Sequence, residues 1–344
     1  MDLRESDQEQ AFRAEAREWL TANVPHGLPS GDTRDGFAAH LEWERLLFDN
    51  RWAVVSWPAA YGGRDASVWE WLAFEEEYYR AGGPQRVTQN GIFLLAPTLF
   101  GFGTQEQQDT LLPRMAAAQD LWCQGWSEPG AGSDLASLVS RAEKVDGGWK
   151  LNGQKTWTTR GAFCTHLFGL FRTDAEAQRH KGLTYFLVPL DTPGVTVRGF
   201  ARLDGDEGFA EVFFDDVVVP DSAVLGGVGQ GWSVAMATTG SERGLTLRSP
   251  GRYTATVTRL VELAQQGAPE LRQRVAQAWM DAEAYRLFTL KQVSDEQRGR
   301  SRPGESSLTK LFWSELDVRL HELANDLLGP EAELEGPWSK GFQF

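Results

Sequence analysis

The sequence has 344 residues, of which 41% are hydrophobic, and a formal net charge of −14. Such a chain exceeds the size of one ordinary hydrophobic core, so we expect two or three structural units. The acidic balance argues against a nucleic-acid surface or an anionic membrane as partner, because clustered Lys and Arg bind both. Two cysteines and five histidines, without a His-x-x-x-His or Cys-x-x-Cys pair, offer neither a disulfide framework nor a zinc site.

The N-terminal sequence, Met-Asp-Leu-Arg-Glu-Ser-Asp-Gln, is polar and acidic, unlike a signal peptide. No apolar run approaches the length that spans a bilayer. The two thiols, Cys123 and Cys164, suit a reducing compartment. These features predict a cytoplasmic protein that has no membrane partner.

Residues 1–118 are predicted to be helical. Their helix starts carry three capping-box patterns, namely Ser6-x-x-Glu9, Ser67-x-x-Glu70 and Thr104-x-x-Gln107. Three consecutive glutamates, Glu75–Glu77, lie in the helix after the second pattern. Consecutive residues fan around a helix instead of converging on one point, so we expect these carboxylates to form a solvated face.

Residues 119–226 change to the alternating pattern of strands, with turns rich in Gly, Asp and Pro between them. The predicted strands are Leu121–Ser127, Val139–Lys144, Trp149–Gly153, Phe163–Phe171, Leu183–Pro189, Val195–Phe200 and Ala210–Val219. Seven short strands at this spacing predict an antiparallel β-sandwich or barrel.

Residues 227–344 return to a helical pattern, with long runs over 243–266, 270–297 and 305–328. Pro250 is expected to kink or interrupt the first run. Gly227-Val-Gly-Gln-Gly231 lacks the βαβ context of a dinucleotide-binding loop and is interpreted as a helix-entry turn. The fold class is therefore α+β and multidomain: an N-terminal helical domain (1–118), a central β domain (119–226) and a C-terminal helical domain (227–344).

Two stretches of the β region carry the functional signal. The first, Trp122-Cys-Gln-Gly-Trp-Ser-Glu-Pro-Gly-Ala-Gly-Ser-Asp134, ends in a Gly-rich turn, where backbone N–H groups can approach a polar ligand closely. The second, Leu151-Asn-Gly-Gln-Lys-Thr-Trp-Thr-Thr-Arg-Gly161, places an aromatic residue and two threonines on a predicted strand. In sequence, order and separation, Ser127–Asp134 and Asn152–Thr159 resemble the two flavin-contacting segments of the flavin-dependent acyl-CoA dehydrogenases.

The resemblance covers nearly all of the chain and implies the all-α/β/all-α domain order of that family. It implies α,β-dehydrogenation of an acyl-CoA thioester to a trans-2-enoyl-CoA, with FAD as the cofactor. A buried flavin needs hydroxyl and N–H partners at its polar edge and aromatic walls for its ring. The residues to which the resemblance assigns flavin contact are Gln124, Trp126, Ser127, Gly132, Ser133, Trp157 and Thr159.

The resemblance also points to the catalytic base. Many members carry a glutamate near the C-terminus, in a segment that this sequence does not contain, so we expect either a truncated chain or a base elsewhere. A minority carries the glutamate on the helix after the linker, directly before an arginine. Glu242 and Arg243 occupy that place, so Glu242 is the predicted base. Arg243 and Ser133 are predicted to contact the substrate.

The implied partners are an electron-transferring flavoprotein, which accepts the electrons, and further subunits in a dimer or tetramer. The family's Arg-x-x-Phe-Gly motif, which reaches the flavin of a neighbouring subunit, is missing from residues 258–269. This departure leaves open a homo- or a hetero-oligomer. The alternatives are a non-catalytic or half-site subunit of a hetero-oligomeric dehydrogenase, and an acyl-CoA oxidase.

Overall fold

The computed structural model describes residues 4–243, 249–265, 268–300, 304–336 and 338, and for residues 241–243 it describes the backbone alone. The chain forms two compact units, each built from separate stretches of sequence. The first comprises Met1–Gly27, Asp65–Pro84 and Arg243–Phe344, and the second comprises Leu28–Arg64 and Gln85–Glu242. The division of the sequence at residues 118 and 226 remains a prediction.

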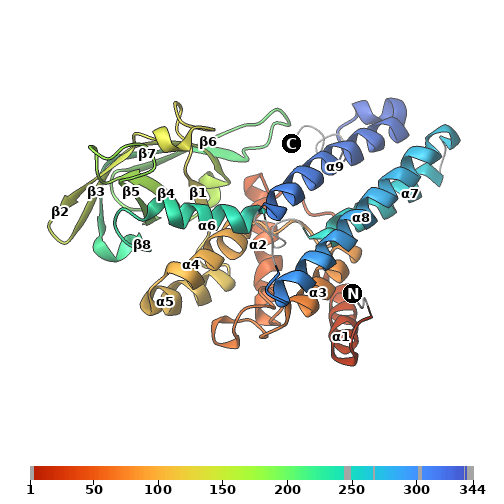
Figure 1. Cartoon of the computed structure of the whole chain (residues 1–344). Helices are drawn as coiled ribbons and strands as arrows, with labels where there is room; N and C mark the ends of the chain where they lie inside the picture. The colour runs from red at the N-terminus through yellow and green to blue at the C-terminus, as the bar shows by residue number, and fades with distance from the viewer. Residues whose placement is uncertain (1–3, 244–248, 266–267, 301–303, 337, 339–344) are drawn as a thin grey trace. The chain divides into compact units, whose positions relative to one another are not determined.

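The first unit is helical. Its helices are α1 (Asp7–Asn23), α3 (Val68–Arg80), α7 (Pro250–Gln265), α8 (Arg272–Gln297) and α9 (Glu305–Leu328) (Figure 1). Both predicted capping boxes are present at its helix starts, at Ser6 and Ser67. Helix α7 begins at Pro250, as expected of a residue that suits the first turn of a helix and disrupts its interior. Apolar side chains of α7, α8 and α9 pack into one buried cluster.

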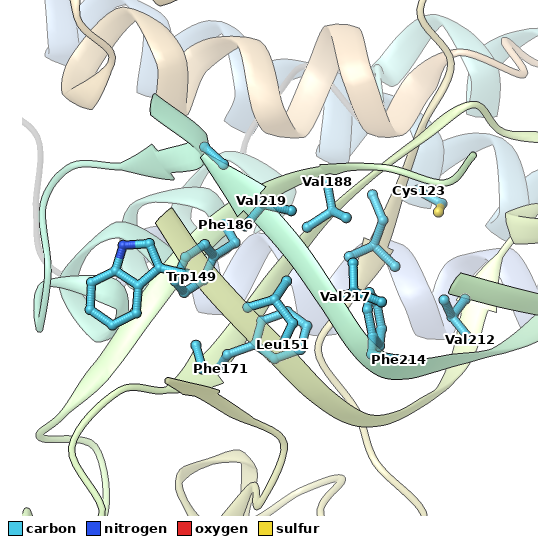
Figure 2. Close-up of a cluster of buried hydrophobic side chains, with 13 residues drawn as sticks. Cys123, Trp149, Leu151, Phe171, Phe186, Val188, Val212, Phe214, Val217 and Val219 are labelled. Carbon is cyan, nitrogen blue, oxygen red and sulfur yellow. The ribbon is translucent and has the colours of Figure 1, made fainter. Parts of the chain in front are cut away.

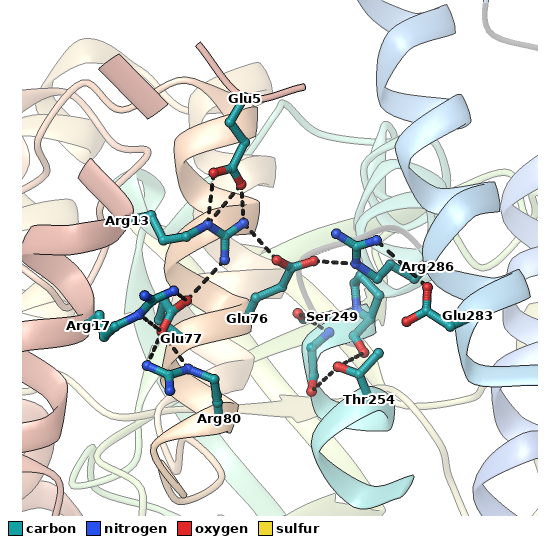
Figure 3. A network of polar contacts seen from close by, with 12 residues as sticks. Glu5, Arg13, Arg17, Glu76, Glu77, Arg80, Ser249, Thr254, Glu283 and Arg286 are labelled. Carbon is teal, nitrogen blue, oxygen red and sulfur yellow. Dashed lines mark hydrogen bonds and ion pairs between the residues drawn. The ribbon is translucent and has the colours of Figure 1, made fainter. Parts of the chain in front are cut away.

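The glutamates of α3 correct the prediction of a solvated face. Glu75 and Glu77 are buried, and Glu76 is largely covered. Figure 3 shows the reason for Glu76 and Glu77: arginines of α1, α3 and α8 converge on these two carboxylates. The prediction was wrong because Glu76 and Glu77, although they point in different directions from the helix, each meet arginines that pair with them.

The second unit combines helices with a sheet. Its helices are α2 (Arg34–Asp49), α4 (Ala96–Phe102), α5 (Gln105–Ala116) and α6 (Gly231–Arg243), with a π-helical turn, η2 (Asn90–Leu95), before α4. The third predicted capping box is present at Thr104, the N-cap of α5. The N-cap of α2 is Thr33, whose hydroxyl accepts a hydrogen bond from the Gly36 N–H.

Eight strands form the sheet of the second unit, in the order β6-β7-β3-β2-β4-β5-β8, and β1 pairs with β4. They are β1 (Trp122–Gly125), β2 (Arg141–Val145), β3 (Gly148–Thr159), β4 (His166–Arg172), β5 (Leu183–Pro189), β6 (Val195–Phe200), β7 (Phe209–Pro220) and β8 (Val224–Leu225). The sheet is mostly antiparallel, as predicted, but β4 pairs in parallel with β1 and with β2. Strand β3 joins the predicted strand Trp149–Gly153 to the second motif.

Apolar side chains of the sheet form the core of the second unit (Figure 2). Phe171 and Phe186 meet edge to face, as do Phe171 and Phe214. Leu151 on β3 and Cys123 on β1 contribute to the same cluster. This core therefore fixes the strands that carry both motifs. None of the helices in the described ranges is long and apolar enough to cross a membrane.

Candidate functional site

The segment directly after β1 contacts β3, so the two motifs meet. The Thr156 N–H donates a hydrogen bond of 2.9 Å to the carbonyl oxygen of Ser127. The Lys155 ammonium lies 3.4 Å from the carbonyl oxygen of Trp126. Ser127 therefore lies beside Thr156, the residue before Trp157, and the assignment of both motifs to one site stays a prediction.

Trp157 sits on a bulge. Lys155 pairs with Val212 and Thr158 pairs with Ala210, so two residues of β3 lie opposite one residue of β7. Trp157 adopts a φ of 58°, a left-handed conformation that costs a bulky residue about 1–3 kcal/mol. Its side chain is 61% exposed. A strained backbone that turns a large aromatic ring toward the exterior is typical of a functional position.

Two phenylalanines flank Trp157 and complete what we term the aromatic shelf, defined as Trp157, Phe200 and Phe209. The ring centroids of Trp157 and Phe200 are 5.3 Å apart, and those of Trp157 and Phe209 are 5.5 Å apart. Both pairs are edge to face, with interplanar angles of 80° and 84°. Trp157 remains 61% exposed beside these contacts, so the shelf can pack against a flat ring.

Two buried polar atoms near the shelf have no hydrogen-bond partner within the described part of the chain. They are the Trp126 indole nitrogen and the Thr158 hydroxyl, and both residues are buried. A buried donor without a partner is costly, which makes such atoms candidates for contact with a ligand. Trp126 also packs edge to face against Phe168 and Tyr185. The exposed Trp157 side chain and these two groups match what a flavin requires of a site.

The remaining predicted flavin contacts lie on β1, at the end of β3 and in the Gly-rich loop. Gln124 is half-buried on β1, and Thr159 is half-buried at the end of β3. Gly132 and Ser133 are exposed in the Gly-rich loop after β1. Contacts link Trp126 and Ser127 to Lys155 and Thr156, directly before Trp157, whereas no described contact links Gly132 or Ser133 to that part of β3.

A buried ion pair joins the two motifs. Lys155 and Glu128 have side chains that are 0% and 3% exposed, and Lys155 Nζ lies 2.7 Å from Glu128 Oε1. The backbone N–H groups of Val139 and Ser140 also donate to Glu128. Burial lowers the pKa of Lys155 to about 8, although Glu128 opposes the shift. Burial alone would raise the pKa of Glu128, but Lys155 and the N–H donors hold it below its ordinary value.

Neither partner of this pair was assigned a role from the sequence. Both lie inside the motifs, and their opposite charges, one in each motif, were the available signal. Because the pair satisfies the charges on both segments, it fixes the loop that begins at Glu128 against β3.

A cavity of about 440 Å³ opens beside the Gly-rich loop. Its walls come from this loop, from the chain before and at the start of β2, and from the middle of β3: Glu128–Ala131, Ser137, Val139–Arg141 and Asn152–Gln154. Neither Ser127 nor Trp157 lines it. The cavity and the aromatic shelf are therefore separate features of the second unit.

The predicted base lies on the last turn of α6. Glu242 and Arg243 belong to this helix, but their side chains lie outside the described residues. One turn earlier, the buried Thr238 hydroxyl lies 2.9 Å from the Thr98 hydroxyl and 3.3 Å from the Tyr185 hydroxyl. These contacts fix α6 against α4 and β5.

Comparisons with known proteins agree with this geometry. Family models of the acyl-CoA dehydrogenase N-terminal, middle and C-terminal domains match residues 6–119, 123–217 and 229–341. Acyl-CoA dehydrogenase IpdE1 of Mycobacterium tuberculosis is 40% identical over 351 residues, which cover 97% of this chain and 90% of that protein. Its namesake in Mycolicibacterium smegmatis is 40% identical over 342 residues, covering 93% and 86%.

Two solved structures share the fold closely. The first, described as "Tcur3481-Tcur3483 steroid ACAD", is 27% identical with a TM-score of 0.86, and the match covers 98% of this chain and 89% of that one. The second, the ChsE4-ChsE5 complex from Mycobacterium tuberculosis, is 25% identical with a TM-score of 0.83, covering 100% and 92%. With its motifs, domain order and relatives in agreement, the chain belongs to the acyl-CoA dehydrogenase family, whose members are oxidoreductases acting on CH–CH bonds.

Proposed function

We propose that this chain is an FAD-dependent acyl-CoA dehydrogenase that converts an acyl-CoA thioester to a trans-2-enoyl-CoA. The observation that carries the proposal is the bulge at Trp157, which turns a strained, exposed indole outward beside the end of β1. Strained backbone conformations of this kind cluster at ligand-binding and active sites.

The residues of both motifs would hold the flavin. Trp157 offers an aromatic wall for the ring, and the Trp126 indole N–H and the Thr158 hydroxyl are buried groups without partners in the described ranges. Gln124, Ser127 and Thr159 add polar groups nearby. We place Gly132 and Ser133, in the Gly-rich loop, near the flavin pyrophosphate and the CoA end of the substrate, as the resemblance implies. When bound, FAD supplies the acceptor for the β-hydride.

Glu242 is the proposed base, which removes the α-proton of the thioester. The proton ends on the carboxylate, and Arg243 and Ser133 are proposed to contact the substrate. The buried hydroxyls of Thr98, Thr238 and Tyr185 fix α6 one turn before Glu242. A fixed helix favours catalysis because proton transfer requires a carboxylate held within hydrogen-bond reach of the reacting carbon.

The assembly and the substrate class follow the relatives. The steroid ACAD and the ChsE4-ChsE5 complex are each described by two component names. We accordingly propose a hetero-oligomer that takes a bulky, ring-containing acyl-CoA, transfers electrons to an electron-transferring flavoprotein and works in the cytoplasm.

The test begins with the purified protein, together with any partner chain that copurifies. Yellow protein that is bleached anaerobically by an acyl-CoA supports the proposal, and a panel of ring-containing and straight-chain thioesters reports the substrate class. Glu242→Gln should retain flavin and lose bleaching, whereas the exposed Glu270→Gln should behave as wild type. Normal bleaching in Glu242→Gln would remove that residue from its role. Colourless protein that still binds CoA would favour the structural-subunit alternative, and rapid oxygen consumption would favour an oxidase.

A further inference from the structure

One buried carboxylate bridges two arginines of the second unit. Asp32 lies in the loop before α2. Its Oδ1 accepts a hydrogen bond of 2.6 Å from Arg160 Nε, and its Oδ2 accepts one of 2.6 Å from Arg202 Nη1. All three side chains are buried, with exposed fractions of 5–8%. Both oxygens of Asp32 are therefore engaged by residues far from it in the sequence.

Through Arg160, Asp32 is connected to Trp157, which lies three residues earlier in the chain. Arg160 also adopts a positive φ, 55°, so the short stretch from Trp157 to Arg160 contains two left-handed residues that are not glycine. Its backbone N–H is held by the Gly208 carbonyl at 2.9 Å. Two strained positions so close together persist only where their surroundings hold them in place. The ion pair with Asp32 fixes the side chain of Arg160 in this way.

Through Arg202, Asp32 is connected to Phe200 and Phe209, the other two residues of the aromatic shelf. Arg202 lies in the loop between β6 and β7, which Phe200 and Phe209 flank. Its guanidinium also donates to Asp204 at 2.6 Å, and its backbone N–H donates to the Asp206 carbonyl at 2.9 Å. Asp32 thus ties the loop that separates Phe200 and Phe209 to the segment that contains Trp157.

We propose that Asp32 is a positioning residue that, through Arg160 and Arg202, holds the aromatic shelf in the arrangement that binds the flavin ring. This role rests on the proposed function. Asp32 acts at a distance and contacts no reacting atom.

Of the two arginines that Asp32 contacts, Arg160 depends on it more than Arg202 does. In the described part of the chain, the Arg160 side chain has one other acceptor, the Arg86 carbonyl at 3.4 Å, whereas Arg202 keeps Asp204. An asparagine at position 32 therefore leaves the Arg160 guanidinium buried without a carboxylate. Removing one partner of a buried pair leaves the other charge uncompensated, so the strained segment beside Trp157 should relax.

The experiment measures FAD affinity by titrating apoprotein, together with the fluorescence of the bound flavin. Asp32→Asn should weaken binding about tenfold, a ratio typical of one lost charge-assisted hydrogen bond, and should raise flavin fluorescence as the stacked indole loosens. The matched control is Asp204→Asn, which alters the same network but leaves the Asp32–Arg160 contact intact. It should change the affinity by less than about threefold, since Arg202 keeps Asp32.

A double-mutant cycle separates positioning from general loss of stability. In a Trp157→Ala background, Asp32→Asn should have almost no further effect on FAD affinity, because its effect passes through the indole. Equal losses in both backgrounds, or unchanged affinity in Asp32→Asn, would overturn the proposal. Should Asp32→Asn fail to fold, Arg160→Lys tests the same contact, with the same expectation in the cycle. Wild-type apoprotein that binds no FAD would instead overturn the proposed function.

Discussion

Lys155 Nζ lies 2.7 Å from Glu128 Oε1, and this buried contact joins the two motifs of the site. Glu128 begins the Gly-rich loop, and Lys155 precedes the bulge that exposes Trp157. Residues of both segments are predicted to contact the flavin, and the ion pair holds one segment against the other.

Lys155→Met should therefore disturb both stability and flavin binding. It leaves Glu128 charged and buried without its partner, which typically costs about 3–5 kcal/mol. The control is Lys144→Met, because Lys144 pairs with Asp221 on the surface of the same unit and exposed pairs contribute less than about 1 kcal/mol. Denaturant unfolding and the ratio of bound FAD to protein measure the two effects. Equal stability losses in both variants would show that the buried pair has no special role.

Gly153→Ala should be damaging for a related reason. Gly153 has a φ of 144°, and a Cβ built on it would lie 2.2 Å from Ser140 Oγ and 2.8 Å from Ser140 Cα. The added methyl must displace Ser140, whose N–H donates to Glu128, so we expect a loss of about 2–4 kcal/mol and weaker flavin retention.

Gly147 provides the comparison for that variant. It also has a positive φ, 72°, but a Cβ added there would meet no described atom within 4 Å. Gly147→Ala should cost about 1 kcal/mol, the backbone term alone, and leave flavin binding unchanged. Urea unfolding of both variants checks the difference, and similar losses at the two positions would contradict the role given to Ser140.

Local patterns predicted much of the fold. The capping boxes at Ser6, Ser67 and Thr104 involve residues three positions apart, and all three are present. The alternation of strand residues likewise located the seven longer strands, while the flavin contacts that the resemblance implies for Trp157 and Ser127 stay predictions.

Local sequence patterns could not predict contacts between residues that are far apart in the sequence. The burial of Glu77 depends on arginines of α1, which lie more than fifty residues away in sequence. Asp32 lies in a loop without a motif, and its two partners follow it by 128 and 170 residues. The bulge at Trp157 arises from the register between β3 and β7, which one strand's sequence does not encode. These features therefore escaped prediction because each depends on pairing between distant segments of the chain.

Glu77 predicts how the first unit responds to acid. Burial would raise the pKa of Glu77, but hydrogen bonds from Arg17, Arg80 and Arg13 outweigh it and lower the pKa to about 2 (Figure 3). A carboxylate whose folded pKa is depressed stabilises the fold above its unfolded pKa, and this contribution is lost as the pH falls. The loss should occur between about pH 4.5 and pH 2.

Glu77→Gln tests that dependence. At pH 7 it should lower the stability of the first unit by about 2 kcal/mol, less than the full shift implies because Arg17 and Arg80 are half-exposed. At pH 3 the difference from wild type should be smaller. Urea midpoints at both pH values measure it, with the exposed Glu18→Gln as a control that should match wild type at each. A penalty that does not change with pH would contradict the assignment.

Trp157 offers a test in which stability and function separate. Glycine adopts a φ of 58° without strain, so Trp157→Gly should recover about 1 kcal/mol of backbone energy while losing edge contacts of similar value. We therefore expect an apoprotein about as stable as wild type. Trp157→Ala keeps the strain and loses the same ring, so it should be less stable than the glycine variant by about 1 kcal/mol.

Both variants should bind FAD weakly and to a similar degree, since both lack the aromatic wall that the indole provides. Thermal unfolding of the apoproteins and FAD titration give the two quantities independently. Wild-type affinity in either variant would show that the ring is not a flavin contact. A glycine variant less stable than the alanine variant would show instead that the left-handed backbone at this position stores no strain, since glycine then gains nothing from its freedom.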